Sequence, residues 1–359
     1  MKRTLINIAI LSTILGTGMA QAGGWDRSGQ DTSIILKEGN LLEVSSVSVA
    51  PKITGTYLGS TNATGDVAPD YSFTNIAFRT QINDDVSIAL IQDEPFGAGV
   101  DWKNGTGAYT TVNAKISTAA TTVMVGYDLD NVTIYGGIKN QKFGAKAYVP
   151  IDGVGYMNIT STPDTSLGYV VGAAIERPEI ALRVALTYHT KITHDLSIVE
   201  TLNGGTATPS TLTADTPSSF NLDFQTGVAE NTLLFGTIRS VQWTQTILNP
   251  ALYVVKANKP LKKFTSDTVS YSLGLGRKFS DQWSGAVTYG TEAAEGTAGG
   301  PLGPTDGYSK MGVGVTYSGE RANITLGVQQ INNGDTATPA ATMSDNTTLV
   351  TAVKIAYNF

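Results

Sequence analysis

The chain has 359 residues, a formal net charge of −6 and no cysteine. The lack of thiols excludes disulfides, thiolate metal sites and cysteine nucleophiles, and the acidic balance without a basic run argues against a nucleic-acid partner. The 39 glycines, with many Thr, Ser, Asn and Tyr residues, are typical of strands and turns.

The first residues predict an export signal. Met1-Lys2-Arg3 is basic, Thr4 to Met19 is mostly apolar, and Ala20-Gln21-Ala22 fits a cleavage site. We therefore expect residues 1–22 to be a cleavable signal peptide. No other segment approaches the ~18 consecutive apolar residues that indicate a membrane-spanning helix.

Residues 23–40 precede the first alternating segment and are too polar and irregular for a strand, as Trp25-Asp26-Arg27-Ser28-Gly29-Gln30 shows. Two interpretations stand for this short stretch. It folds back into the lumen of a barrel as a hatch-like plug, or it is a disordered tether.

Residues 41–359 contain about fourteen segments in which apolar and polar side chains alternate with the period of a β-strand. In chain order they are 41–54, 71–82, 86–91, 109–127, 132–148, 167–176, 179–194, 220–229, 232–244, 268–279, 282–291, 307–318, 321–331 and 347–359. Short connections alternate strictly with long ones, as in bacterial outer-membrane barrels with tight periplasmic turns. We predict an all-β fold, a transmembrane antiparallel β-barrel of about 14 strands in one domain.

The alternation also predicts which side chains face the lumen. In segment 179–194, Arg183, His189 and Lys191 fall on the inward face and Ile192 on the lipid face. A charge in hydrocarbon costs about 2–4 kcal/mol at the midplane, so the two cations are expected inside. The last segment ends on Phe359, which we expect to contact the barrel-assembly machinery of the outer membrane.

Catalytic chemistry is not indicated. His189 and His194 are the only histidines, and no serine lies in a G-x-S-x-G setting. On one continuous strand the two histidines, five residues apart, would face opposite sides and could not share a metal ion. We expect no enzyme activity, no metal and no cofactor.

The external segment 245–267 is unusually apolar for its position. Leu248, Leu252, Tyr253 and Val255 lie in it, close to four lysines at 256, 259, 262 and 263. An apolar surface ringed by lysines suits an amphiphile with an anionic head. It would equally suit lipopolysaccharide phosphates, or part of it would only extend a strand above the membrane.

Three stretches resemble the FadL-type outer-membrane transporters of long-chain fatty acids and other hydrophobic compounds, the TodX group. They are the turn and strand at 177–190 (RPEIALRVALTYHT), the strand entry at 217–222 (PSSFNL), and Asp281-Gln282-Trp283-Ser284 after a strand that ends at Phe279. They occur in the family's strand order over essentially the whole chain after residue 22.

The resemblance implies capture of a ligand in an external apolar groove, transfer to a deeper site, and sideways exit through a gap beside a kinked third strand. By family position, loops 149–166 and 195–219 would form the groove, with Ile198, Val199, Leu202 and Leu212 as apolar members. The family's hatch is longer than residues 23–40 and carries Asn-Pro-Ala, which this stretch lacks, so gating by a full hatch is not implied.

The third segment here leads into a run in which Pro95, Phe96, Gly97 and Gly99 would flank such an opening. Proline removes a ladder donor and glycine marks bends and bulges, so pairing can break at this point. The alternative is that this run is simply the start of loop 93–108.

We therefore expect uptake of hydrophobic compounds across the bacterial outer membrane, such as long-chain fatty acids or aromatic hydrocarbons, by passive, ligand-gated lateral diffusion through the barrel wall. Expected partners are these small molecules, outer-membrane lipids and lipopolysaccharide, with the protein a monomer. The alternatives are a general diffusion porin or ion channel, and a structural or adhesive barrel.

Overall fold

The structure is a computed structural model that describes residues 25–102, 109, 111–296 and 300–359. The predicted signal peptide, residues 1–22, lies outside the described residues. Within the described part of the chain, no helix is long and apolar enough to cross a membrane.

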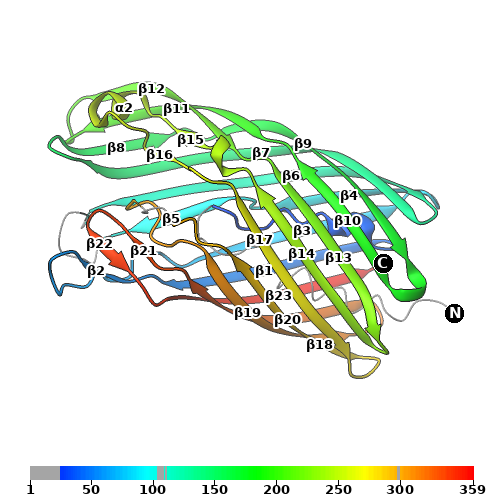
Figure 1. Cartoon of the computed structure of the whole chain (residues 1–359). Helices are drawn as coiled ribbons and strands as arrows, with labels where there is room; N and C mark the ends of the chain where they lie inside the picture. Colours follow the sequence, from blue (N-terminus) through cyan, green and yellow to red (C-terminus); the bar gives the residue numbers. More distant parts are fainter. Residues whose placement is uncertain (1–24, 103–108, 110, 297–299) are drawn as a thin grey trace.

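Fourteen antiparallel strands form a closed barrel (Figure 1), as the alternating segments predict. They are β1 (Leu41–Lys52), β3 (Tyr71–Gln81), β4 (Val86–Asp93), β6 (Asn113–Leu129), β7 (Val132–Ile151), β9 (Asp164–Arg177), β10 (Leu182–His189), β13 (Ser219–Ala229), β14 (Thr232–Val241), β17 (Thr268–Lys278), β18 (Trp283–Glu292), β19 (Tyr308–Ser318), β20 (Ala322–Asn333) and β23 (Asn346–Asn358). The first and last strands close the ring, with Leu41 opposite Asn358 and Lys52 opposite Thr347.

The outward side chains of the strands are mostly apolar, and many of the inward ones are small or polar. In β17, Tyr271, Leu273 and Leu275 are each about half exposed, whereas Gly274 and Gly276 between them are buried. Buried charged side chains, among them Arg79, Lys139, Arg239, Lys310 and Lys354, lie on the inner face. A ring with an apolar exterior and a charged, filled interior is the inverse of a water-soluble sandwich.

Three further strands extend one side of the barrel: β8 (Gly155–Ser161), β11 (Ile192–Leu202) and β12 (Ala207–Thr216). The far end of β7 pairs with β8, β8 with β11, and β11 with β12. The regions 149–166 and 195–219 were expected to be loops, and this expectation is wrong because both continue as paired strands. Together they form an external sheet at the end of the barrel opposite the chain's C-terminus (Figure 1).

The remaining short elements lie mostly in the external connections. They are η2 (Ser33–Leu36), η3 (Pro178–Ile180), η4 (Trp243–Gln245), α2 (Ala251–Ala257), β2 (Gly55–Tyr57), β5 (Gly97–Asp101), β15 (Ile247–Leu248), β16 (Lys262–Lys263), β21 (Thr336–Ala337) and β22 (Ala341–Met343). Helix α2 packs over β12 and covers the external sheet.

The expected single strand 179–194 is divided in two, and one part of its predicted facing is wrong. β10 ends at His189, and β11 begins at Ile192 with the alternation reversed. Ile192 is buried instead of facing outward, and Lys191 is half exposed and paired with Asp215 at 2.9 Å instead of facing the lumen. For the same reason His189 and His194 are both buried on the inner side.

Candidate functional site

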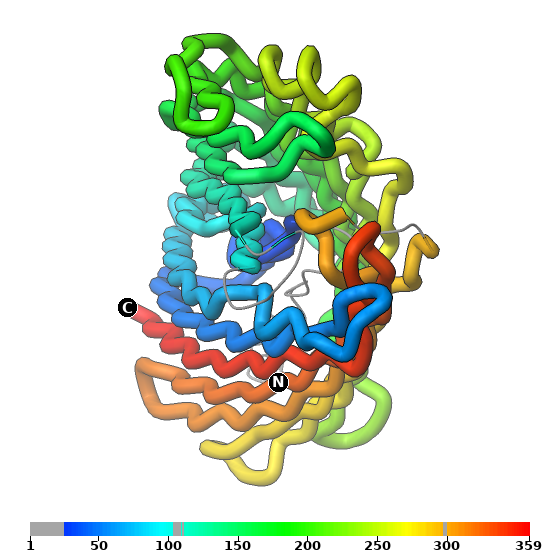
Figure 2. Tube along the Cα trace, turned by 90° about the vertical axis from the view of Figure 1, so that its left-hand side faces the viewer, coloured from blue at the N-terminus to red at the C-terminus, as the bar shows by residue number. Residues whose placement is uncertain are grey.

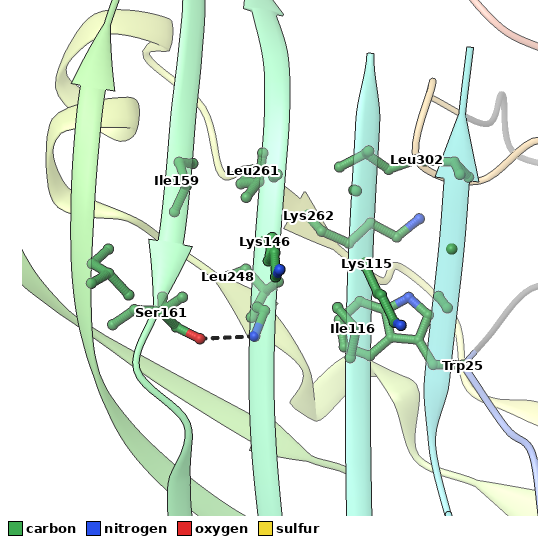
Figure 3. A pocket seen from close by; sticks show the side chains of 18 residues that line it. Trp25, Lys115, Ile116, Lys146, Ile159, Ser161, Leu248, Leu261, Lys262 and Leu302 are labelled. Atoms are coloured by element: carbon green, nitrogen blue, oxygen red, sulfur yellow. Dashed lines mark hydrogen bonds between the residues drawn. The ribbon is translucent and has the colours of Figure 1, made fainter. Parts of the chain in front are cut away.

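An apolar cavity lies between the external sheet and the segment from η4 to β16 (Figure 3). Its empty volume is about 590 Å³, including space open to solvent. The lining side chains are mostly aliphatic, and they include Ile116, Ile159, Ile198, Leu212, Leu248, Leu261 and Leu302. A cavity with a mostly aliphatic lining and few polar groups is typical of a site for a small hydrophobic ligand.

Four aromatic rings lie next to this cavity, and one of them, Trp25, lines it. Trp25 packs edge-on against Phe264 with ring centroids 5.2 Å apart, and Trp243 contacts Trp25, Phe264 and Phe96 at 6.1, 5.0 and 5.6 Å. All four are 5% exposed or less. The cavity is thus in contact with the N-terminal segment through Trp25. Phe96 is linked to Trp25 through Trp243, which contacts both rings.

Lys262 brings a positive charge to this apolar site. Its ammonium lies 4.6 Å from the centroid of the Phe264 ring, and burial lowers the pKa of Lys262, with Glu295 opposing that shift. Lys115 and Lys146 also line the cavity, but they alternate with the buried Ile116 and Ala147, so their side chains are exposed. Of the three lysines that line the cavity, Lys262 is therefore the one whose side chain is not exposed to solvent on the outer face.

The structure brings together most of the predicted capture residues. Ile198, Leu212 and Leu248 line the cavity, and Tyr253, Leu202 and Leu252 belong to the same apolar cluster. Two predicted residues do not join them, because Val199 is 42% exposed on the other face of β11 and Val255 is 76% exposed on α2. Trp25 was not predicted to line a site, because it lies in a polar N-terminal stretch that gives no sign of a ligand contact.

Residues 25–40 lie inside the ring of strands (Figure 2) and are held by three arginines of the wall. Arg239 binds Asp26 through two hydrogen bonds and also Gln30 at 3.1 Å. Arg79 donates to the carbonyls of Ile35 and Gly39, and Arg183 donates to the carbonyl of Leu36 at 3.0 Å. The three residues of η2 from Ile34 to Leu36 are buried against inward-facing side chains. The segment therefore occupies the lumen with a defined conformation.

The wall is interrupted after β4. β4 and β5 both pair with β6 on one side, but Glu94, Pro95 and Phe96 separate them. On the other side β3 pairs with β4 only from Ile76 to Gln81, and the described pairings include none between β3 and β5. On the side that faces β5, the described pairings therefore include no partner for the five residues Tyr71–Asn75. We call this gap in the strand pairing the interval. It ends where the backbone amide of Asp101 donates a hydrogen bond to the carbonyl of Val67.

The N-terminal segment lies across this interval. Arg27 and Gly97 donate backbone hydrogen bonds to Pro95 and Trp25, at 3.0 and 2.6 Å, so that Asp26 is bridged to Phe96. The Arg27 side chain forms an ion pair with Glu94 at 3.0 Å and stacks over the Tyr71 ring at 4.2 Å. Its guanidinium fills the space beside Gly97, where a Cβ would lie 2.5 Å from Arg27 Cζ.

The predicted lumen residues lie near this segment or beneath the cavity. Arg183 faces inward and is paired with Glu176 at 2.7 Å. His189 is 1% exposed, and its Nδ1 lies 3.1 Å from Lys139 Nζ. His194 stacks on Phe143 and bonds Asp164. Among the described residues no group of three or more His, Cys, Asp or Glu could hold a metal ion.

Comparisons with known proteins show likeness in structure only. No protein-family model matches the sequence, and no curated protein matches it significantly. A FadL homologue of Pseudomonas aeruginosa superimposes with a TM-score of 0.80 at 14% identity, over 97% of this chain and 98% of that one.

Two further solved structures show the same likeness. The toluene transporter TodX of Pseudomonas putida gives a TM-score of 0.65 at 11% identity, over 96% and 99% of the two chains. The toluene transporter TbuX of Ralstonia pickettii gives 0.64 at 11%, over 90% and 91%. The resemblance to FadL/TodX-type transporters is thereby confirmed at the level of the fold.

Proposed function

We propose that this protein takes up hydrophobic small molecules across a bacterial outer membrane. The observation that carries the proposal is the apolar cavity at the external end of a closed barrel, in contact with a lumen segment that lies across a break in the wall. The outward apolar band of the strands supports placement in a membrane. The fold shared with the solved toluene transporters supports a hydrophobic cargo.

The preferred cargo is an amphiphile with a carboxylate head, such as a long-chain fatty acid. The aliphatic lining of the cavity suits an alkyl chain, and Lys262 would supply the partner for the carboxylate. A neutral aromatic hydrocarbon would make the apolar contacts but leave this cation without a ligand partner. The cavity chemistry therefore favours the acid.

The exit route would be the interval between β3 and β5. Passage from the cavity to lipid there avoids the polar lumen, in which buried arginines hold the N-terminal segment. Arg27 occupies the interval, so its side chain and the backbone from Trp25 to Ser28 would have to move before a ligand passes. In this proposal residues 23–40 serve as a short plug. Trp25 lines the cavity, and its carbonyl bonds the wall at Gly97, so a ligand that displaces Trp25 would also disturb the backbone that lies across the interval.

Filling the cavity tests the proposal. Ala147 is 6% exposed and lines the cavity, so Ala147→Phe should weaken binding of a fluorescent fatty acid to the purified protein at least tenfold and reduce uptake by cells. Ala119→Phe adds the same ring at an exposed position of the neighbouring β6 and serves as the control. Equal binding by Ala147→Phe and the unmodified protein would contradict the proposal.

A further inference from the structure

Three lysines form a cationic patch on the outward face of β6 and β7, above the apolar band: Lys115, Lys142 and Lys146. The highest apolar pair on these strands is Ile138 opposite Val123, both about half exposed. Lys142 follows Ile138 by four residues, which is about 13 Å along the strand and about 10 Å along the membrane normal at the usual strand tilt. The patch therefore lies at the level of lipid headgroups.

The register of the patch brings like charges together without an acidic partner. Lys115 is directly opposite Lys146, an arrangement that destabilises a sheet when nothing neutralises it. The other cross-strand neighbours of the three lysines are Gly99, Thr160, Ala119 and Thr165. Among the described residues, no ion pair or hydrogen bond engages any of the three ammonium groups.

Another outward-facing lysine, Lys191, behaves differently, which makes the contrast informative. It is half exposed, lies just before β11 and is paired with Asp215 at 2.9 Å. The fold thus supplies an acid for one outward lysine and none for the patch. An anion from outside the chain is the physical complement of the patch.

An aromatic platform continues the patch away from the membrane. Tyr148 follows Lys146 on the same face of β7, and its ring stacks on Tyr156 of β8 with centroids 5.2 Å apart and planes 3° apart. Asn113 and Asn158 lie opposite Tyr148 on the two neighbouring strands. Stacked aromatic rings flanked by amides suit the faces and hydroxyls of sugars.

We propose that this face binds lipopolysaccharide, with the lysines on the lipid A phosphates and the tyrosine pair on the inner-core sugars. The order of groups along β7, apolar band, then lysines, then aromatic pair, follows the order of acyl chains, phosphates and sugars in that glycolipid. The proposal rests on the outer-membrane placement given above. Binding is measured without transport, so its failure leaves the uptake proposal intact.

The test titrates the detergent-solubilised protein, freed of bound lipid, with rough lipopolysaccharide that carries the inner core, read by native mass spectrometry. The double variant Lys115→Gln/Lys146→Gln should bind at least tenfold more weakly. The matched control, Arg277→Gln/Arg321→Gln, removes two exposed cations at the opposite end of the barrel and should bind within twofold of the unmodified protein. Heat-modifiable electrophoretic mobility verifies that each variant is folded.

Two further arms identify the recognised groups. Enzymatic removal of the phosphates should weaken binding to the unmodified protein as much as the double variant does. Tyr148→Ala should weaken binding of the core-bearing form but leave that of core-less lipid A unchanged. Unaltered binding by the double variant would overturn the proposal, and so would complete competition by millimolar inorganic pyrophosphate, which would indicate a general anion site.

Discussion

Lys262 lines a mostly aliphatic cavity, and burial lowers the pKa of its ammonium. A charged lysine stripped of water gains from a carboxylate partner more than an exposed lysine does, because screening is weaker there. A neutral hydrocarbon has no charge for Lys262 to pair with, so its binding should not depend on this residue. Lys262 is therefore the residue expected to raise the affinity for a fatty acid above the affinity for a hydrocarbon.

Replacement of Lys262 by glutamine should weaken binding of a long-chain fatty-acid anion about tenfold, equivalent to ~1.4 kcal/mol, and leave toluene binding within twofold. The lowered pKa means that the ammonium is lost at a lower pH than for an ordinary lysine. Affinity for the acid should therefore fall as pH rises, before the usual lysine range is reached, and the variant should lack this fall. Lys263→Gln, at the exposed neighbour, is the control in fluorescence titrations.

Arg239 holds the lumen segment through Asp26 and Gln30, and its side chain is 3% exposed. Removing one partner of a buried ion pair costs about 3–5 kcal/mol because the other charge stays unpaired. Arg239→Ala should therefore release the segment and raise single-channel conductance in planar bilayers several-fold. Arg277→Ala, at an exposed strand end, should leave conductance unchanged; equal conductance in both variants would show that Arg239 does not hold the segment.

Among the elements, the fourteen barrel strands were predictable because one face of each meets an apolar surrounding, which imposes a period of two over its whole length. The break at Thr190–Lys191 was not predictable. Two residues, instead of one, separate the inward-facing His189 and Ile192, which reverses the facing, but each half still alternates correctly and only the pairing partners reveal the change. The external strands β8 and β12, and β11 after His194, were taken for loops. β8 and β12 are short and polar and carry a weak alternation. Only part of the cavity could be predicted from the sequence, because Trp25, Lys262 and Ile116 come from segments far apart in the chain.

The interval beside β5 makes a prediction for Gly97, whose position packs against Arg27. A leucine there would fill the space through which a ligand leaves. Gly97→Leu should reduce fatty-acid uptake at least fivefold while binding in the cavity stays within twofold. Gly300→Leu, where a Cβ would meet no atom within 4 Å, is the control; normal uptake by Gly97→Leu would place the exit elsewhere.

The whole molecule is a barrel with an apolar exterior and a lumen that holds residues 25–40. Arginines of three strands, β3, β10 and β14, fix this segment across the lumen, where it stands in the way of a wide aqueous path of the porin type. Cavity, aromatic cluster, N-terminal segment and wall interval are joined in that order by direct contacts. In the proposed route a hydrophobic compound travels along these contacts from the external end to the membrane without crossing the lumen.

The most direct test of this route uses the cysteine-free chain to staple the N-terminal segment to the wall. Asp26 and Phe96 form an antiparallel bridge flanked by the hydrogen bonds of their neighbours, and such pairs have Cα atoms about 4.5 Å apart, within the range of a disulfide. The double variant Asp26→Cys/Phe96→Cys should take up fatty acid when reduced and lose at least nine-tenths of that uptake when oxidised. Equal uptake in the reduced and oxidised states would contradict the route from the cavity through the wall.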